Sequence, residues 1–155
     1  YNIALKNKKG LKMNIKIVSG SNGSGKSLYL SKLYKENEVK SIFVSDFTIF
    51  YNISEKDLIS REMSKGQYKL HMLLKASSAV VNGGTLIIDD IDTYLHPDIQ
   101  QNMISHLIEK NPEIKNLIVS THSPMLIMKK WQDCVVNVED FNSFEDFKNI
   151  EFNQN

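Results

Sequence analysis

Two kinds of apolar pattern alternate along the chain. Short runs of aliphatic and β-branched residues, bounded by polar or glycine-rich segments, are typical of strands, and they fall at residues 1–5, 13–18, 41–45, 85–88, 116–120 and 135–138. Stretches with apolar residues three or four positions apart are typical of helices, and they cover residues 27–36, 67–81 and 97–108. Strands that alternate with helices in this way predict an α/β fold with a mostly parallel sheet flanked by helices.

Each predicted helix has an apolar side that can cover the sheet. The residues expected on these sides are Leu28, Leu30, Leu33 and Tyr34 in the first helix, Leu70, Leu73, Leu74, Ser77 and Val81 in the second, and Ile99, Met103, Ile104, Leu107 and Ile108 in the third. The Asn-Gly-Gly sequence at 82–84 should end the second helix, and Pro97 should begin the third.

Three segments are less regular. The first two strand-like runs flank a basic, turn-like segment and predict a short N-terminal antiparallel hairpin. Residues 46–62 could extend a strand or line a loop, and Ser54 with Asp57 three positions later could cap a short helix there. Residues 140–155 form a weakly patterned tail. Because Met13 is a candidate natural start, residues 1–12 could be a tag or a trimmed segment. We expect one domain over residues 1–155.

Composition and charge exclude some classes of protein and favour none. The 155 residues are 41% hydrophobic and 24% charged, with a net charge of +1, so nothing global indicates a membrane or nucleic-acid partner. Arg61 is the only arginine, which argues against base-specific reading of DNA. The basic cluster Lys6, Lys8, Lys9 and Lys12 could contact a nucleic-acid backbone or be a solvated turn. The single Cys134 forms no internal disulfide, which fits a cytoplasmic protein.

The strongest motif is a phosphate-binding loop at residues 20–27. The residues Gly20, Ser21, Asn22, Gly23, Ser24, Gly25, Lys26 and Ser27 match the pattern G-x-x-x-x-G-K-[ST] at every fixed position. The loop lies between a predicted strand and a predicted helix, the context that this motif requires. Its backbone N–H groups should hold the phosphates of ATP, while Lys26 neutralises the β- and γ-phosphates and the Ser27 hydroxyl binds Mg²⁺.

Polar residues follow two of the other predicted strands. Asp89 and Asp90 come directly after the apolar run at 85–88, and His122 closely follows the run at 116–120. Ligands of open α/β sheets bind at these carboxyl ends. We therefore expect Asp89 to hold Mg²⁺, Asp90 to orient or deprotonate the attacking water, and His122 to sense the γ-phosphate. Without the phosphate loop, two carboxylates in a turn and one histidine in a loop would be ordinary surface features.

These motifs together resemble the ABC ATPase superfamily. Residues 64–67, Ser-Lys-Gly-Gln, look like the short signature sequence of that superfamily and precede a predicted helix. Residues 90–97, Asp-Ile-Asp-Thr-Tyr-Leu-His-Pro, and residues 120–124, Ser-Thr-His-Ser-Pro, resemble segments of its SMC-, RecF- and OLD-like branch. The resemblance runs from about Ile15 to Met128.

The resemblance implies a site shared by two subunits. In ABC ATPases the signature of one subunit caps the γ-phosphate held by the other, so Ser64, Lys65, Gly66 and Gln67 would contact ATP in trans. ATP and Mg²⁺ are then the implied cofactors. Tyr1 could stack on adenine or be a plain strand-edge tyrosine.

The chain also departs from the family pattern. Asp90 stands where the family usually has glutamate, which shortens the side chain by one methylene and should slow turnover. No Q-loop glutamine follows the run at 41–45, and the short segment before Ser64 leaves no room for a long arm or a full helical lid.

The leading functional expectation is an ATPase that dimerises around ATP, with itself or with a related subunit, and switches a protein effector. In this branch such small ATPases occur in prokaryotic defence and DNA maintenance. Two alternatives remain at this stage. One is the nucleotide-binding subunit of a membrane transporter, and the other is a clamp that binds ATP without hydrolysing it, which the aspartate at position 90 leaves open.

Overall fold

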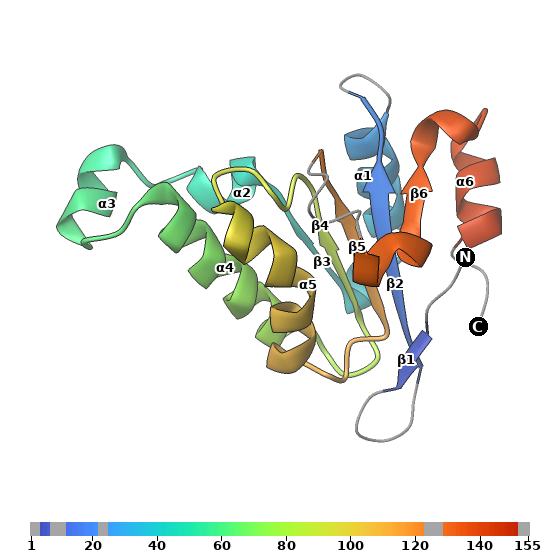
Figure 1. The fold of residues 1–155 in the computed structure, drawn as a ribbon, viewed down its shortest axis with the longest axis horizontal. Coiled ribbons are helices and arrows are strands. Elements are labelled where there is room, and N and C mark those ends of the chain that lie inside the picture. The colour runs from blue at the N-terminus through green and yellow to red at the C-terminus, as the bar shows by residue number, and fades with distance from the viewer. Residues whose placement is uncertain (1–3, 7–11, 22–24, 123–128, 152–155) are drawn as a thin grey trace.

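The fold is a central sheet with helices on both faces (Figure 1). The computed structural model describes residues 4–6, 12–21, 25–122 and 129–151. The strands are β1 (Ala4–Lys6), β2 (Lys12–Ser19), β3 (Ser41–Val44), β4 (Thr85–Ile88), β5 (Asn116–Ser120) and β6 (Val135–Asn137). They form one sheet in the order β1-β2-β5-β4-β3, with β6 also paired to β2.

The strand pairing confirms the predicted sheet. The pairs β2–β5, β5–β4, β4–β3 and β2–β6 are all parallel. Among the described strands, only β1 is antiparallel to its neighbour, with Ala4 opposite Asn14 and Lys6 opposite Lys12. This pairing is the predicted N-terminal hairpin, although residues 1–3 of the first predicted strand lie outside the described part of the chain. Strands β4 and β5 bury nearly every side chain because helices cover both of their faces.

The helices fall into two layers. On one face lie α1 (Lys26–Glu36) and α6 (Phe144–Glu151). On the other face lie α2 (Asp46–Phe50), α3 (Glu55–Ser60), α4 (Lys65–Ala79) and α5 (Pro97–Lys110). Three short 3₁₀ segments, at Glu38–Lys40, Lys129–Cys134 and Val138–Asp140, complete the described elements. Within the described residues, no helix has the length and apolar character needed to cross a membrane.

Several expectations about the helical segments need correction. Residues 46–50 form a helix, not a strand or a loop, because Ser45 and Thr48 build a capping box at its start. The weakly patterned tail contains α6, whose Phe147 is buried against α1. Leu28 is 56% exposed, so the apolar side of α1 is narrower than the sequence pattern suggested. The second predicted helix ends at Ala79 and not at Val81, which lies beyond it and is 53% exposed. The predicted helix at 54–57 is confirmed as α3, with Ser54 and Asp57 as its capping box.

The core consists of two clusters on opposite faces of the sheet. Side chains at alternate positions of β4 belong to different clusters. Leu86 and Ile88 face the α4–α5 layer, and Ile87 faces α1. The parallel strands β2, β4 and β5 all end at the same edge of the sheet, at the top of Figure 1. The segments that follow these three strands carry most of the predicted site residues, so the topology brings them together.

Candidate active site

The phosphate loop begins where β2 ends and leads into α1. Gly25 precedes the helix with a φ of 100°, a left-handed conformation in which any other side chain would be strained. The ammonium of Lys26 donates to the carbonyl oxygens of Gly20 and Ser21, at 2.5 and 3.1 Å. The loop therefore already positions a nearly buried cation against its own backbone. Asn22, Gly23 and Ser24, also expected to bind phosphate, lie outside the described residues.

The predicted metal ligands meet across the sheet edge. The Ser27 hydroxyl donates to Asp89 Oδ2 at 2.7 Å, and the Ser120 hydroxyl donates to the other oxygen of the same carboxylate. Asp89 directly follows β4 and is only 8% exposed. Ser27 of α1 and Ser120 of β5 hold its carboxylate in place. The described residues contain no group of three or more His, Cys, Asp or Glu side chains that could hold a metal. One hydroxyl and one carboxylate nevertheless suit Mg²⁺, which keeps its remaining positions for water and phosphate oxygens.

Asp90 and His122 face each other at the same edge. His122 Nε2 lies 3.4 Å from Asp90 Oδ1, and each side chain is a little over one-third exposed. Burial and the neighbouring Asp89 carboxylate raise the pKa of Asp90, while His122 opposes that shift. The backbone of Asp90 has a φ of 52°, and its N–H donates to the Ser120 hydroxyl at 2.8 Å. A partly exposed carboxylate beside an imidazole can orient a water molecule and accept a proton from it.

Two residues of the segments at 90–97 and 120–124, neither of which was assigned a role, hold this edge in place. Asp92 accepts hydrogen bonds from the Thr121 hydroxyl at 2.8 Å and from the His122 backbone N–H at 3.3 Å. These hydrogen bonds connect the end of β5 to the turn after β4. Both are accepted by the same oxygen, Asp92 Oδ1. Ser120 bridges Asp89 and the backbone of Asp90. Ser120 ends an apolar strand and is the first residue of the segment 120–124 that resembles the family, and this was the available signal.

The segment after β6 supplies a further contact to the phosphate loop. Glu139 accepts hydrogen bonds from the backbone N–H of Ser21, at 3.1 Å, and from its hydroxyl. These two bonds, together with the Lys26 charge, lower the pKa of Glu139. Strand β6 lies parallel to β2 and delivers Glu139 to this position. Glu139 directly follows the predicted strand at 135–138, but it belongs to none of the motifs.

The signature segment, residues 64–67, caps α4. Ser64 accepts from the Gln67 backbone N–H at 3.1 Å, and the Gln67 side chain accepts from the Ser64 N–H at 2.9 Å. Lys65 lies over the rings of Tyr94 and Phe50, at 4.9 and 5.5 Å from their centroids. Gly66 is pressed against the Tyr94 carbonyl, since a Cβ at this position would lie 2.5 Å from that oxygen. Ser64, Lys65 and Gln67 are exposed, so they remain open to a partner molecule.

The signature segment lies apart from the phosphate loop of its own chain. Figure 1 shows the start of α4 beside α3, with the sheet between this layer and α1. Four predicted site features are thus placed together, namely the described part of the loop with Lys26, the Ser27–Asp89 pair, Asp90 and His122. The signature segment forms a second, separate group.

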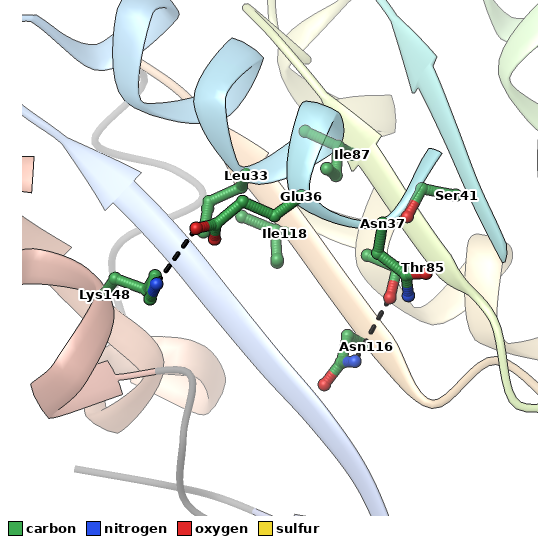
Figure 2. A pocket seen from close by; sticks show the side chains of 9 residues that line it. All are labelled: Leu33, Glu36, Asn37, Ser41, Thr85, Ile87, Asn116, Ile118 and Lys148. Carbon is green, nitrogen blue, oxygen red and sulfur yellow. Dashed lines mark hydrogen bonds and ion pairs between the residues drawn. The ribbon is translucent and has the colours of Figure 1, made fainter. Parts of the chain in front are cut away.

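Other expectations concern residues away from this edge. Tyr1, Lys8 and Lys9 lie outside the described residues, whereas Lys6 and Lys12 are opposite each other in β1 and β2. His96 caps α5, where its Nδ1 accepts from the Asp98 N–H at 3.3 Å. A pocket of about 290 Å³ is lined by residues of α1, β3, β4 and β5 and by Lys148 of α6. Figure 2 shows these side chains. The lining of the pocket includes Thr85 and Asn116, the first residues of β4 and β5, so it lies at the opposite end of these strands from Asp89 and contains none of the predicted site residues.

Comparison with known proteins agrees with this geometry. Residues 28–128 match the family described as "AAA domain, putative AbiEii toxin, Type IV TA system". This chain belongs to that family. The match begins directly after the phosphate loop and includes the signature segment, Asp89, Asp90 and His122.

Two similar proteins extend the comparison. The "Retron Vc95 probable ATPase" of Vibrio cholerae serotype O1 biovar El Tor is 38% identical over 86 residues, which are 54% of this chain and 16% of that protein. The chain therefore corresponds to a small part of this relative. A solved structure from Pyrococcus furiosus, titled "Putative ABC transporter (ATP-binding protein)", covers 86% of this chain and 91% of its own with a TM-score of 0.55. At 14% identity this likeness concerns the fold alone. The predicted membership in the ABC-type P-loop ATPase superfamily is confirmed.

Proposed function

We propose that the chain binds ATP and Mg²⁺ at the edge formed by the phosphate loop, Asp89, Asp90 and His122, hydrolyses ATP slowly, and does so as a dimer. The observation that carries this proposal is the 2.7 Å contact between the Ser27 hydroxyl and Asp89. It joins the residue after the loop lysine to the carboxylate directly after β4, and this pairing of groups is what nucleotide-bound Mg²⁺ requires in P-loop proteins.

Each residue would then have a distinct task. Lys26 would leave the Gly20 and Ser21 carbonyls and turn to the β- and γ-phosphates. Ser27 and Asp89 would hold Mg²⁺, which neutralises charge that develops on the phosphate oxygens. Asp90 would orient the attacking water and His122 would contact the γ-phosphate. The shorter reach of aspartate compared with glutamate is the reason for expecting slow turnover.

The signature segment supports the dimer. Ser64, Lys65, Gly66 and Gln67 are placed at the N-terminus of a 15-residue helix, where free backbone N–H groups and the helix dipole favour an anion. This end of α4 is separated from the loop of the same chain by the sheet. Its donors would therefore cap the γ-phosphate bound by a second copy or by a related ATPase subunit.

The wider role is proposed from the relatives. The family description names a type IV TA system and a toxin, and the Vibrio cholerae relative is named for a retron. We propose that ATP-driven dimerisation of this domain switches a protein effector in a prokaryotic defence or DNA-maintenance system. We also place it in the cytoplasm, where ATP is abundant and the lone, buried Cys134 stays reduced.

The test uses two inactive variants with different defects. Lys26→Ala should abolish ATP binding, because it removes the cation that opposes the phosphates. Ser64→Arg should leave ATP binding by the monomer intact but block ATP-dependent dimerisation and hydrolysis. Mixing the two should restore about half of wild-type turnover at most, since only one of two interfaces then combines an intact loop with an intact signature.

Sedimentation with ATP and Mg²⁺ measures the dimer, and phosphate release measures turnover. Wild-type affinity in Lys26→Ala would contradict the assignment of the loop. Normal hydrolysis by monomeric Ser64→Arg would show that residues 64–67 are only a helix cap. A wild-type protein that forms the ATP-dependent dimer without releasing phosphate would identify a clamp.

A further inference from the structure

Lys69 is a fully buried lysine whose charge has four oxygen partners. It lies one turn after Lys65 on α4 and is 0% exposed. Its ammonium donates to the carbonyl oxygens of Asp90 and Thr93, at 2.6 and 2.9 Å, and to the Thr93 hydroxyl at 2.6 Å. It also forms an ion pair with Asp46 at 2.8 Å. Three segments distant in the sequence therefore meet at this one cation.

The contacts of Lys69 indicate a geometric role. Burial lowers the pKa of Lys69, and its hydrogen bond and charge interaction with Asp46 only partly offset that shift. An apolar side chain of similar volume often stabilises a core as well as or better than a buried ion pair does. What such a side chain cannot do is bind carbonyl oxygens. Two of the four partners of Lys69 are carbonyls in the turn formed by residues 90–94.

The same turn touches the signature helix at two other points. Gly66 packs against the Tyr94 carbonyl, and Lys65 covers the Tyr94 ring. The turn begins with Asp90 in a left-handed backbone conformation, which costs free energy and persists only where surrounding contacts hold it. Lys69 binds the carbonyl of that same residue, so it constrains the peptide group directly attached to the residue that carries the carboxylate.

We propose that Lys69 is a positioning residue that fastens the 90–94 turn to the signature helix and thereby sets the place of the Asp90 carboxylate in its own subunit. Thr93 completes the link, because its hydroxyl binds Lys69, Asp46 and the Asp90 carbonyl. This inference rests on the proposed function, in which Asp90 orients water beside the loop of the same chain.

The test compares matched substitutions in the full chain with ATP and Mg²⁺. Thr93→Val keeps the shape of the side chain and removes its hydroxyl, whereas Thr93→Ser keeps the hydroxyl and removes a methyl. Thr93→Val and Lys69→Met should lower kcat by about 10- to 100-fold, the usual effect of displacing a catalytic group by about 1 Å. Thr93→Ser should retain most of the wild-type rate. ATP affinity should stay within about twofold, because the phosphate loop is untouched.

Ser77→Ala is the control for a loss of stability alone. Ser77 is buried on the same helix and donates to the Leu107 carbonyl at 2.8 Å, but it has no contact with the turn. Its kcat should equal that of the wild type. If Thr93→Val and Lys69→Met also turn over at the Ser77→Ala rate, the positioning role is wrong. If Lys69→Met does not fold, the Thr93 pair decides the question.

Mixed dimers test whether the effect belongs to one subunit. In the mixture of Lys26→Ala with Ser64→Arg, the working site uses the loop and the Asp90 of the Ser64→Arg subunit. Thr93→Val added to that subunit should lower turnover, and Thr93→Val added to the Lys26→Ala subunit should not. Equal losses from both placements would overturn the inference. A wild-type protein that neither dimerises nor hydrolyses ATP would overturn the proposed function together with it, whereas a fully active wild type with indifferent Thr93 variants overturns this inference alone.

Discussion

Replacing Gly66 with alanine should destabilise the protein, although the same change usually stabilises a helix. Gly66 lies in the first turn of α4, and alanine is favoured over glycine by up to about 1 kcal/mol in a helix interior. At this position, however, the new Cβ would lie 2.5 Å from the Tyr94 carbonyl oxygen. That contact is about 1 Å shorter than the usual approach of carbon atoms to their neighbours, so the helix or the 90–94 turn must move.

The magnitude follows from setting these two effects against each other. Overpacking of a tight contact costs about 1–3 kcal/mol, and the obstacle here is a backbone atom, which cannot move aside as the end of a flexible side chain can. We expect a net loss of about 1–2 kcal/mol in the free energy of unfolding. For a chain of this size, that corresponds to a decrease of about 2–8 °C in Tm.

Urea denaturation and thermal melting of Gly66→Ala measure the effect, with Ser78→Ala as the control. Ser78 is exposed on the same helix and bonds only to the carbonyls of Leu74 and Lys75, so its replacement by alanine should be neutral or slightly stabilising. Gly66→Ala should also lower kcat, because displacement of the turn moves Asp90. A Gly66→Ala protein at least as stable as the wild type would refute the tight packing between the signature segment and the turn, and with it one support for the positioning role of Lys69.

Two further predictions concern the catalytic carboxylate and a helix cap. Asp90→Asn should bind ATP and accumulate as an ATP-bound dimer, because the amide keeps the shape of the side chain but cannot act as a base; unchanged phosphate release would show that Asp90 does not orient the water. Asp90→Glu should raise turnover if the reach of the side chain limits it. The hydrogen bonds that Asp57 accepts from Ser54 lower the pKa of Asp57 from its usual 3.8. The ionised Asp57 therefore contributes stability above pH 3.8, and this contribution is lost as the pH falls through the lowered pKa. In urea titrations, the difference in stability between wild type and Asp57→Asn should narrow toward acid pH. A difference that stays constant would contradict the capping role.

The elements that the sequence predicted well are those whose patterns are local. The sheet strands, the helix after the phosphate loop and the α3 capping box each depend on residues within a few positions of one another. Residues 46–50 were ambiguous because Phe47, Ile49 and Phe50 suit a strand as well as a helix, and the Ser45–Thr48 capping box decides between them. Phe47 remains 71% exposed, so burial alone could not have settled the matter.

The predicted site residues share a different property. The phosphate loop, Asp89, Asp90 and His122 were found because each follows an apolar strand, and parallel strands end at one edge of the sheet. Glu139 reaches the same edge from the segment directly after β6 and also follows a predicted strand, but it belongs to no motif. Its role depends on a pairing between β2 and β6 that joins positions more than one hundred residues apart.

Lys69 shows most clearly where reading by pattern ends. On α4 it lies between exposed and apolar residues, and a lysine in a helix is usually taken as part of the solvated face. Its burial depends on Asp46 and on the carbonyls of the 90–94 turn, groups that lie about twenty residues away on either side. Nothing local to the helix encodes them. A buried charge such as that of Lys69 can remain in the core only if its partners are positioned accurately. One of these partners is the Asp90 peptide group. Accurate positioning of this peptide is also what the proposed chemistry at the Asp90 carboxylate needs. The contacts that bury Lys69 cannot be read from the sequence pattern, and the same contacts give Lys69 its proposed role next to the site.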